Sequence, residues 1–338
     1  MLESLQTQWG DTMKAILCKE YGGPEKLIIG DTDSPIPEPD QVVVDVYAAS
    51  INFPDTLQIQ GKYQFQPPMP FTPGSEVGGV VSHVGSEVSN LKVGDRVMAV
   101  STIGGMAEQV CCNASSVRKI PDNMDFNTAA GFAMVYTTSY HALKQRARIQ
   151  PGETLLVLGA SGGVGLATVE LGKAMGAKVI AAASSAEKLA VAKEAGADEL
   201  INYAEEPLKD AVKKLTHSKG VDVIYDPVGG DFTEQALRAM AWNGRHLIIG
   251  FAAGEIPKIP ANLTLLKGCS VVGVFWGSFT QREPEASAQN MMELMKLYAE
   301  GKIDPKISAV YDFEDYASAL GALTERKATG KVVLKVGS

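Results

Sequence analysis

The chain has 338 residues, of which 45% are hydrophobic, and a formal net charge of −8 at pH 7. That length allows two domains, each with its own core. The negative charge argues against a nucleic-acid partner, because such a surface needs clustered Lys and Arg to neutralise phosphates. No apolar stretch approaches the roughly 18 residues of a membrane-spanning helix, so we expect no membrane partner either.

The N-terminus and the cysteines favour a cytoplasmic location. Residues 1–12 contain no apolar signal core, and we expect them to form an N-terminal extension. The four cysteines are scattered, and only Cys111 and Cys112 are neighbours. This usage is typical of reduced thiols rather than of a disulfide framework.

Short runs of apolar and β-branched residues, separated by Gly, Pro and Asp, predict β-strands before residue 100. The predicted strands are 13–18, 41–49, 77–84 and 95–99. We expect these strands to form an irregular antiparallel barrel.

After Gly152 the pattern changes to strands that alternate with helices. The predicted strands are 154–159, 178–183, 221–226 and 245–250, and the predicted helices are 163–175, 186–195, 207–216 and 231–239. This alternation predicts an α/β domain with a doubly wound parallel sheet. A helix at 285–298 and a final strand at 331–336 could return to the first domain.

The most informative motif is the glycine-rich turn at residues 159–165, between a predicted strand and a predicted helix. Glycines allow a tight turn and a close approach to a pyrophosphate, and the amides that open the helix then face the anion. The spacing departs from a strict GxGxxG. Its context, with a second apolar strand from Lys178, nevertheless predicts a dinucleotide site.

The same turn also satisfies GxSxG, the nucleophile elbow of an α/β-hydrolase, with Ser161 as the nucleophile. Asp226 and His246 follow in the order of a Ser-Asp-His triad. Against this interpretation, Gly165 continues the glycine pattern and no HGGG-type segment lies upstream. A serine hydrolase that uses Ser161 and a non-catalytic NADPH-binding protein are kept as alternatives.

The end of the second strand of this domain favours NADPH over NADH. An NAD site would place an acidic residue about 20 positions beyond the glycines. This chain has Ser184 and Ser185 there, with no carboxylate. Small hydroxyls leave room for a 2′-phosphate, and Lys188 can supply positive charge, so NADPH (NADP) is the predicted cofactor.

The sequence offers no zinc site. A catalytic zinc needs three ligands drawn from Cys, His and carboxylates, but the four histidines are isolated and no CxxC occurs. We therefore predict no metal. Without a Lewis acid, the expected chemistry is hydride delivery to an acceptor already activated by conjugation, such as a quinone or an α,β-unsaturated carbonyl.

Several motifs occur in a fixed order along nearly the whole chain. They are GSEVGGVV from Gly74, VGDRV from Val93, ASGGVG from Ala160, AGAD from Ala195, DPVGG from Asp226 and GKVVL from Gly330. The ordered set resembles the medium-chain dehydrogenase/reductase superfamily, and within it the zinc-free NADPH:quinone oxidoreductase (zeta-crystallin-like) branch. Where zinc-dependent relatives carry Gly-His-Glu, this chain has Gly74, Ser75 and Glu76.

The resemblance implies a domain organisation. A GroES-like β-barrel catalytic domain would comprise residues 13–135 and 280–338. A Rossmann NADP-binding domain with a doubly wound parallel sheet would be inserted at residues 136–279. The implied activity is zinc-independent transfer of a hydride from NADPH to a quinone or an enone, with an enoyl-thioester of the acryloyl- or crotonyl-CoA type as the alternative substrate.

The resemblance also implies catalytic residues. Asn52 would hydrogen-bond near the nicotinamide or the substrate oxygen, Asp55 would hold the loop, and Tyr63 would lie at the rim of the site. One departure matters, because Leu57 stands where many relatives carry a tyrosine that could donate a proton. The acid must then be Tyr63, a bound water or nothing specific. Alternatively, Asn52 and Asp55 only cap a helix and Tyr63 only packs.

The remaining implied residues bind the cofactor. Lys188 and Tyr203 would contact the 2′-phosphate, and Thr138 would touch the nicotinamide end. The full set is Thr138, Ser161, Gly162, Gly163, Val164, Ser184, Ser185, Lys188, Tyr203, Gly250, Phe251, Ala252, Phe275, Trp276, Gly277 and Lys331.

The apolar run at residues 269–277 predicts an edge strand that must be covered. In the resembled family the corresponding strands pair across a two-fold axis and extend the sheet. We therefore expect a homodimer.

Overall fold

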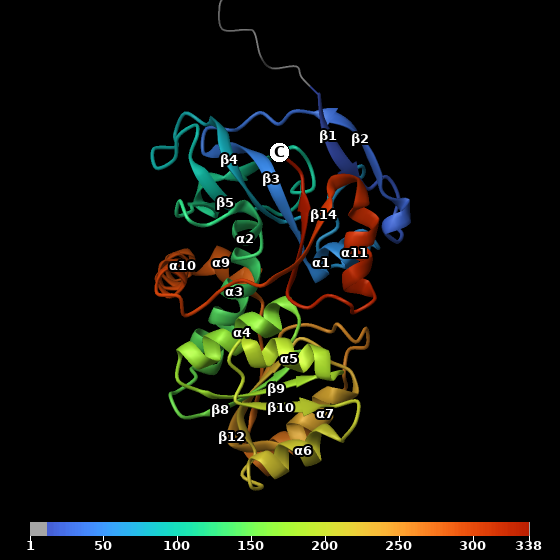
Figure 1. The fold of residues 1–338 in the computed structure, drawn as a ribbon, viewed down its shortest axis with the longest axis vertical. Coiled ribbons are helices and arrows are strands. Elements are labelled where there is room, and N and C mark those ends of the chain that lie inside the picture. Colours follow the sequence, from blue (N-terminus) through green and yellow to red (C-terminus); the bar gives the residue numbers. More distant parts are fainter. Residues whose placement is uncertain (1–11, 338) are drawn as a thin grey trace, which may run out of the picture. The chain divides into compact units, whose positions relative to one another are not determined.

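The computed structural model of the chain describes residues 12–337 and divides into two compact units (Figure 1). The first unit comprises Met1–Met134 and Ile307–Ser338, and the second comprises Val135–Lys306. Of the expected N-terminal extension, residues 1–11 lie outside the described residues, whereas Thr12 is the first residue of a strand.

The first border between the units lies within one residue of the expected one. The second lies at Ile307, whereas we expected the return at residue 280. The helix α10 (Pro284–Ala299) remains with the second unit because it is hydrogen-bonded to that unit. Tyr140 Oη donates to Glu293 Oε2 at 2.6 Å, and Lys144 Nζ donates to Asn290 Oδ1 at 3.2 Å.

The first unit contains a small hairpin and a larger sheet. The hairpin is β1 (Thr12–Leu17) with β2 (Ile28–Asp33), and the larger sheet has the order β14-β15-β3-β4-β5-β7, with β6 paired to β3. The bounds are β3 (Gln41–Ile51), β4 (Glu76–Val84), β5 (Arg96–Val100), β6 (Gln109–Asn113), β7 (Val117–Lys119), β14 (Ile307–Asp312) and β15 (Lys331–Lys335). Pairing is antiparallel except between β14 and β15.

The C-terminal strand joins this sheet beside β3, as the sequence suggested. Val332 pairs with Ile51, and Leu334 pairs with Ala49. The helices α1 (Phe53–Gln58), α2 (Phe126–Ala130) and α11 (Tyr316–Thr324) belong to the same unit. The end of β3 therefore lies beside the starts of β4 and β15.

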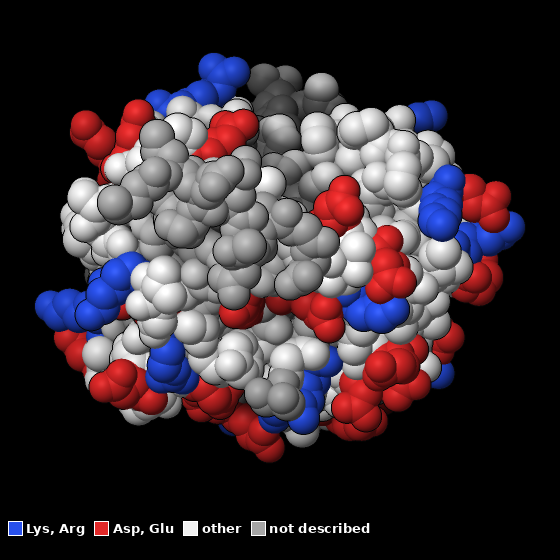
Figure 2. All heavy atoms as spheres, turned by 90° about the horizontal axis from the view of Figure 1, so that it is seen from above, with Lys and Arg blue, Asp and Glu red and all other residues white. Residues whose placement is uncertain are grey.

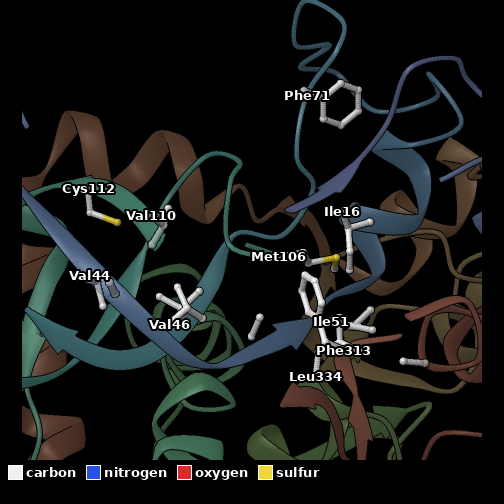
Figure 3. Packing of buried hydrophobic residues seen from close by; sticks show 14 of the residues in the cluster. Ile16, Val44, Val46, Ile51, Phe71, Met106, Val110, Cys112, Phe313 and Leu334 are labelled. Carbon is white, nitrogen blue, oxygen red and sulfur yellow. The ribbon is translucent and has the colours of Figure 1, made fainter. Parts of the chain in front are cut away.

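Both parts of the chain contribute to the core of the first unit. Figure 3 shows Ile51, Phe313 and Leu334 gathered, and each is at most 9% exposed. Burying an aliphatic or aromatic side chain of this size contributes about 1.5–3 kcal/mol. The core thus holds the C-terminal strand against β3, and with it the residues at the strand ends.

The second unit is a six-stranded parallel sheet in the order β10-β9-β8-β11-β12-β13. Its strands are β8 (Thr154–Leu158), β9 (Lys178–Ala183), β10 (Glu199–Asn202), β11 (Val221–Asp226), β12 (Met240–Ile248) and β13 (Ser270–Gly273). The connecting helices are α4 (Gly163–Ala174), α5 (Ala186–Glu194), α6 (Leu208–Leu215), α7 (Asp231–Arg238) and α8 (Ala261–Lys267). This order confirms the predicted doubly wound sheet.

The direction of winding changes between β8 and β11. The chain first adds β9 and β10 on one side of β8, and then adds β11, β12 and β13 on the other. In open parallel sheets, ligands bind outside the carboxyl ends of the strands at such a switch point. The glycine-rich turn lies at this point because it directly follows β8.

One strand prediction is wrong in extent. We expected residues 269–277 to be a single strand, but β13 ends at Gly273, and Trp276 begins the helix α9 (Trp276–Arg282). The last pair of the ladder is Ile248 with Gly273, because β12 ends there. Without a partner strand, the chain turns into a helix. Phe275 and Trp276 therefore stand at a strand-to-helix junction.

Within residues 12–337, no helix combines the length and the apolar character that a membrane crossing requires. On the face seen in Figure 2, acidic and basic side chains are interspersed.

Candidate functional site

The glycine-rich loop after β8 has the shape of a phosphate cradle. Gly159 has a φ of +58°, in the left-handed region that favours glycine. A Cβ at Gly165 would lie 2.3 Å from the carbonyl oxygen of Gly159, so only glycine allows the helix to approach the turn this closely. Gly162 is the N-cap of α4, and no side chain caps the helix there. The main-chain N–H groups in the first turn of α4 can therefore bind an anion, and the loop fits a pyrophosphate.

Polar side chains gather next to this loop, at the carboxyl ends of β9 and β10. Ser185 caps α5 by accepting a hydrogen bond from the Lys188 amide at 3.3 Å, and Lys188 Nζ donates to Ser184 Oγ at 3.4 Å. The Tyr203 amide donates to the Ala183 carbonyl at 3.1 Å, which holds Tyr203 beside the same strand end. One ammonium group and two hydroxyls are the chemistry that a 2′-phosphate requires.

A second pair of loops continues this edge of the sheet. The Ala252 amide donates to the Pro227 carbonyl at 3.0 Å, and the Ala253 amide donates to the Val228 carbonyl at 2.8 Å. A Cβ at Gly159 would come within 3.0 Å of Val228 Cγ2, so the Val228 side chain lies against the glycine-rich loop. The structure thus brings Gly250, Phe251 and Ala252 to the same edge as the cradle.

The other predicted contacts of the second unit lie on further elements. Thr138 is half-buried on α3 (Ala133–His141). Phe275 is 62% exposed just before α9, and Gly277 lies in the first turn of that helix.

One candidate catalytic residue of the first unit, Asn52, belongs to a buried hydrogen-bonded triangle with Glu76 and Lys331. Lys331 Nζ donates to Asn52 Oδ1 at 2.6 Å and to Glu76 Oε2 at 3.3 Å, and Asn52 Nδ2 donates to Glu76 Oε2 at 3.1 Å. The other carboxylate oxygen of Glu76 accepts from the Met134 amide at 2.7 Å. All three side chains are at most 6% exposed. The opposite charges of Lys331 and Glu76 compensate each other. Their hydrogen bonds fix both the Oδ1 and the Nδ2 end of the Asn52 side-chain amide.

Asp55 supports this triangle from the first turn of α1. Its Oδ2 accepts from the main-chain N–H of Asn52 at 2.7 Å, and its side chain is 2% exposed. Burial raises the pKa of Asp55 to about 7, although the hydrogen bond from the main-chain N–H of Asn52 and the positive charge of Lys331 lower it. The pair thus opens a helix and also belongs to the buried cluster, and a role of Asn52 near the nicotinamide or the substrate oxygen stays a prediction.

Tyr63 is half-buried on the segment that follows α1. Burial, followed by the nearby charge of Asp55, raises the pKa of its phenol above 10.0. The phenol thus stays protonated at neutral pH and is influenced by the same carboxyl group.

Sequence reasoning missed Glu76 as a site residue. The available signal was an acidic residue at the start of an apolar strand, since a buried carboxylate needs a positive or donor partner. Lys331 was expected to contact the cofactor. The structure shows its ammonium group on Asn52 and Glu76, which are 279 and 255 residues away in the sequence.

The structure does not assemble the triad that a serine hydrolase would need. His246 Nε2 lies 3.0 Å from Asp226 Oδ2, but His246 Nδ1 is buried without a hydrogen-bond partner among residues 12–337. Ser161 is therefore not hydrogen-bonded to that histidine. Across the described part of the chain, no three His, Cys, Asp or Glu side chains are grouped as metal ligands.

Comparisons with known proteins match one family model to each of the two units. Residues 38–122 match the family model described as "Alcohol dehydrogenase GroES-like domain", and residues 163–296 match the one described as "Zinc-binding dehydrogenase". A "Quinone oxidoreductase-like protein 2 homolog" from Nematostella vectensis is 43% identical over 325 residues, which cover 95% of this chain and 88% of that protein.

Solved structures are similar over the same length. A quinone oxidoreductase from Escherichia coli complexed with NADPH has a TM-score of 0.88 and 30% identity, and the match covers 96% of this chain and 99% of that one. A quinone oxidoreductase from Pseudomonas syringae has a TM-score of 0.89 and 33% identity, with the same coverage.

Proposed function

Because the chain belongs to the zinc-free quinone oxidoreductase branch of the medium-chain dehydrogenase/reductase superfamily, we propose that it transfers a hydride from NADPH to a quinone or to the β-carbon of an α,β-unsaturated carbonyl. The observation that carries the proposal is the cluster of Ser184, Ser185 and Lys188 beside the uncapped start of α4. This cluster combines a cradle for a pyrophosphate with a cation for a 2′-phosphate.

The second unit would hold the cofactor. The amides of Gly163 and Val164 would bind the pyrophosphate beside Ser161 and Gly162, and Lys188 with Tyr203 would bind the 2′-phosphate. When bound, the nicotinamide ring supplies the hydride from its C4 carbon. The similar quinone oxidoreductase from E. coli was solved in complex with NADPH, which supports NADPH as the cofactor.

The first unit would act on the substrate oxygen. Hydride addition to a conjugated acceptor places negative charge on that oxygen, and donors held in advance stabilise the charge. The Asn52 amide is held by Lys331 and Glu76, and its Nδ2 carries a second N–H beyond the one given to Glu76. We assign that N–H to the substrate oxygen. Tyr63 would donate the proton that converts the anion left by hydride addition into the neutral product, since Leu57 carries no proton to donate.

Steady-state kinetics test the proposal. We expect turnover with NADPH and benzoquinone or a simple enone, and crotonyl-CoA in the same assay decides whether an enoyl-thioester is the better substrate. The absence of fluorescence quenching by micromolar NADPH would contradict the proposal. Inactivation by a serine-directed phosphonate would instead support the hydrolase alternative.

Lys188→Ala tests cofactor choice. Loss of one charge-assisted contact of about 1.5–3 kcal/mol should weaken NADPH binding by about 10- to 100-fold and leave NADH binding unchanged. Lys193→Ala is the matched control on the same helix, because its ammonium group donates to the Ala197 carbonyl at 3.1 Å. Equal losses for NADPH and NADH would remove Lys188 from the phosphate site.

We also propose a homodimer built through β13. The strand pairs with β12 on one side, and exposed apolar side chains lie on it, on α8 before it in the chain and directly after it. Leu265 is 79% exposed, Leu266 69%, Phe275 62% and Val271 37%. Exposed apolar side chains beside an unpaired sheet edge favour pairing with a second copy. Light scattering should give twice the chain mass, and a monomer at micromolar concentration would refute the dimer.

A further inference from the structure

A buried histidine in the second unit takes no part in the proposed chemistry. His246 lies on β12 with 0% exposure, and its Nε2 lies 3.0 Å from Oδ2 of Asp226, the last residue of β11. Its other ring nitrogen has no hydrogen-bond partner within the described residues. A polar ring that is removed from water is unfavourable unless it is hydrogen-bonded. The bond to Asp226 is thus the polar contact that holds this ring in place.

Asp226 is saturated with donors. Its Oδ1 accepts from the amides of Val228 at 3.0 Å and Gly229 at 2.8 Å, and its Oδ2 accepts from Thr233 Oγ1 at 2.7 Å as well as from His246. Burial alone would raise its pKa, but the bonds from His246, Gly229 and Thr233 hold the pKa of Asp226 below its usual range. An ionised carboxylate only accepts, so His246 Nε2 carries the proton.

These donors come from different elements, and the carboxylate joins them. Val228 and Gly229 belong to the loop at residues 227–230, and Thr233 belongs to α7, whereas His246 belongs to the sheet itself. The imidazole therefore fixes the carboxylate from the rigid side. The carboxylate then fixes the loop, whose Gly229 has a left-handed φ of +71°.

The loop at 227–230 lies between two parts of the candidate cofactor site. On one side the Val228 side chain lies against Gly159 of the phosphate cradle. On the other, the carbonyls of Pro227 and Val228 accept from the amides of Ala252 and Ala253. A shift of this loop would therefore displace the cradle and the 250–253 segment together.

We propose that His246 is a positioning residue for cofactor binding. Its Nε2–H orients Asp226, and through Asp226 it sets the loop at 227–230 that supports both the glycine-rich cradle and the 250–253 segment. The inference rests on the proposed binding of NADPH at this edge. It assigns a role to a histidine that touches neither the cofactor nor the substrate.

His246→Leu removes the donor, and His246→Gln replaces it with an amide N–H. We expect the leucine variant to raise the Kd for NADPH about tenfold, since a hydrogen bond to a charged group is lost, while kcat at saturating NADPH changes by less than about threefold. Hydrogen exchange of the Gly229 amide should also become at least about tenfold faster. The glutamine variant should restore both quantities to within about threefold of the native protein.

Leu247→Val is the matched control, because Leu247 is a buried neighbour on the same strand that gives Asp226 no donor. It should leave the NADPH Kd and the Gly229 exchange rate unchanged. A folded leucine variant with native Kd and native exchange at Gly229 would overturn the proposal. So would equal effects of the leucine variant and the control.

Thr233→Val provides the second test if the leucine variant does not fold. It removes another donor to the same Oδ2 atom and should shift Kd and exchange in the same direction, and unchanged values would overturn the proposal. If the native protein does not bind NADPH, the proposed function fails. The exchange rates at Gly229 and Ala253 then still decide whether His246 positions the loop.

Discussion

The two units build their candidate sites in different ways. At the carboxyl edge of the second unit, the site consists of main-chain amides, glycines and exposed polar side chains such as Ser184. In the first unit it consists of three buried side chains, Asn52, Glu76 and Lys331, that are bonded to one another. The first kind of site offers donors to a ligand. The second kind uses most of its donors internally and leaves few, well-oriented groups for chemistry.

The largest effect should come from opening the buried triangle. Lys331→Met leaves the Glu76 carboxylate, which is 0% exposed, without its positive partner. Breaking a buried ion pair in this way costs about 3–5 kcal/mol, which denaturant unfolding would measure. Lys335→Met is the control, because Lys335 is exposed at the end of the same strand. Equal stabilities of the two variants would show that the triangle does not stabilise the first unit.

The next effect is the pH dependence of stability that Asp55 contributes in the first unit. The pKa of Asp55 is raised from 3.8 to about 7, so between these values the folded chain binds a proton that the unfolded chain has released. The stabilisation from the protonated form is complete below pH 3.8 and is lost as the pH rises to 7, by at most ~1.4 kcal/mol per pH unit.

Asp55→Asn isolates this contribution, because Glu170 of the second unit has its pKa raised to about 7 by burial and acts in the same direction. The difference in unfolding free energy between the native protein and the variant should change across this window and be flat above it. A difference that is independent of pH would show that Asp55 stays ionised in the folded chain.

A smaller effect sharpens the account of the second unit. In Gly165→Ala the new Cβ would meet the Gly159 carbonyl oxygen at 2.3 Å, whereas in Gly162→Ala its nearest neighbour would be the same oxygen at 3.5 Å. We expect Gly165→Ala to cost about 1–3 kcal/mol of stability and to weaken NADPH binding. Gly162→Ala should be tolerated. Equal binding by both variants would argue against a closely packed cradle.

The contrast between the units also explains what the sequence could predict. The strands and helices around the glycine-rich turn follow from local periodicity, and both the predicted parallel sheet and the family resemblance are confirmed. The short β10 was missed, because Leu200 is partly exposed and the strand has four residues. Residues 269–277 were too apolar for periodicity to show where the strand ends.

The buried triangle could not be predicted in the same way. Asn52 and Asp55 were predicted from the family resemblance, because both lie in one short segment of the sequence. Lys331 meets Asn52 only because β15 returns to pair with β3, and sequence spacing does not reveal such a pairing. The link from His246 to the 227–230 loop likewise depends on the parallel pairing of β11 with β12.

The central claim is that the second unit binds the cofactor while Asn52 of the first unit serves the reaction. Asn52→Ala tests it most directly, with the NADPH Kd and kcat measured on the same preparation. We predict an unchanged Kd and a kcat lowered by about 100-fold or more, as for the loss of an oxyanion donor. An unchanged kcat, or a weakened Kd with native turnover, would contradict this division of roles.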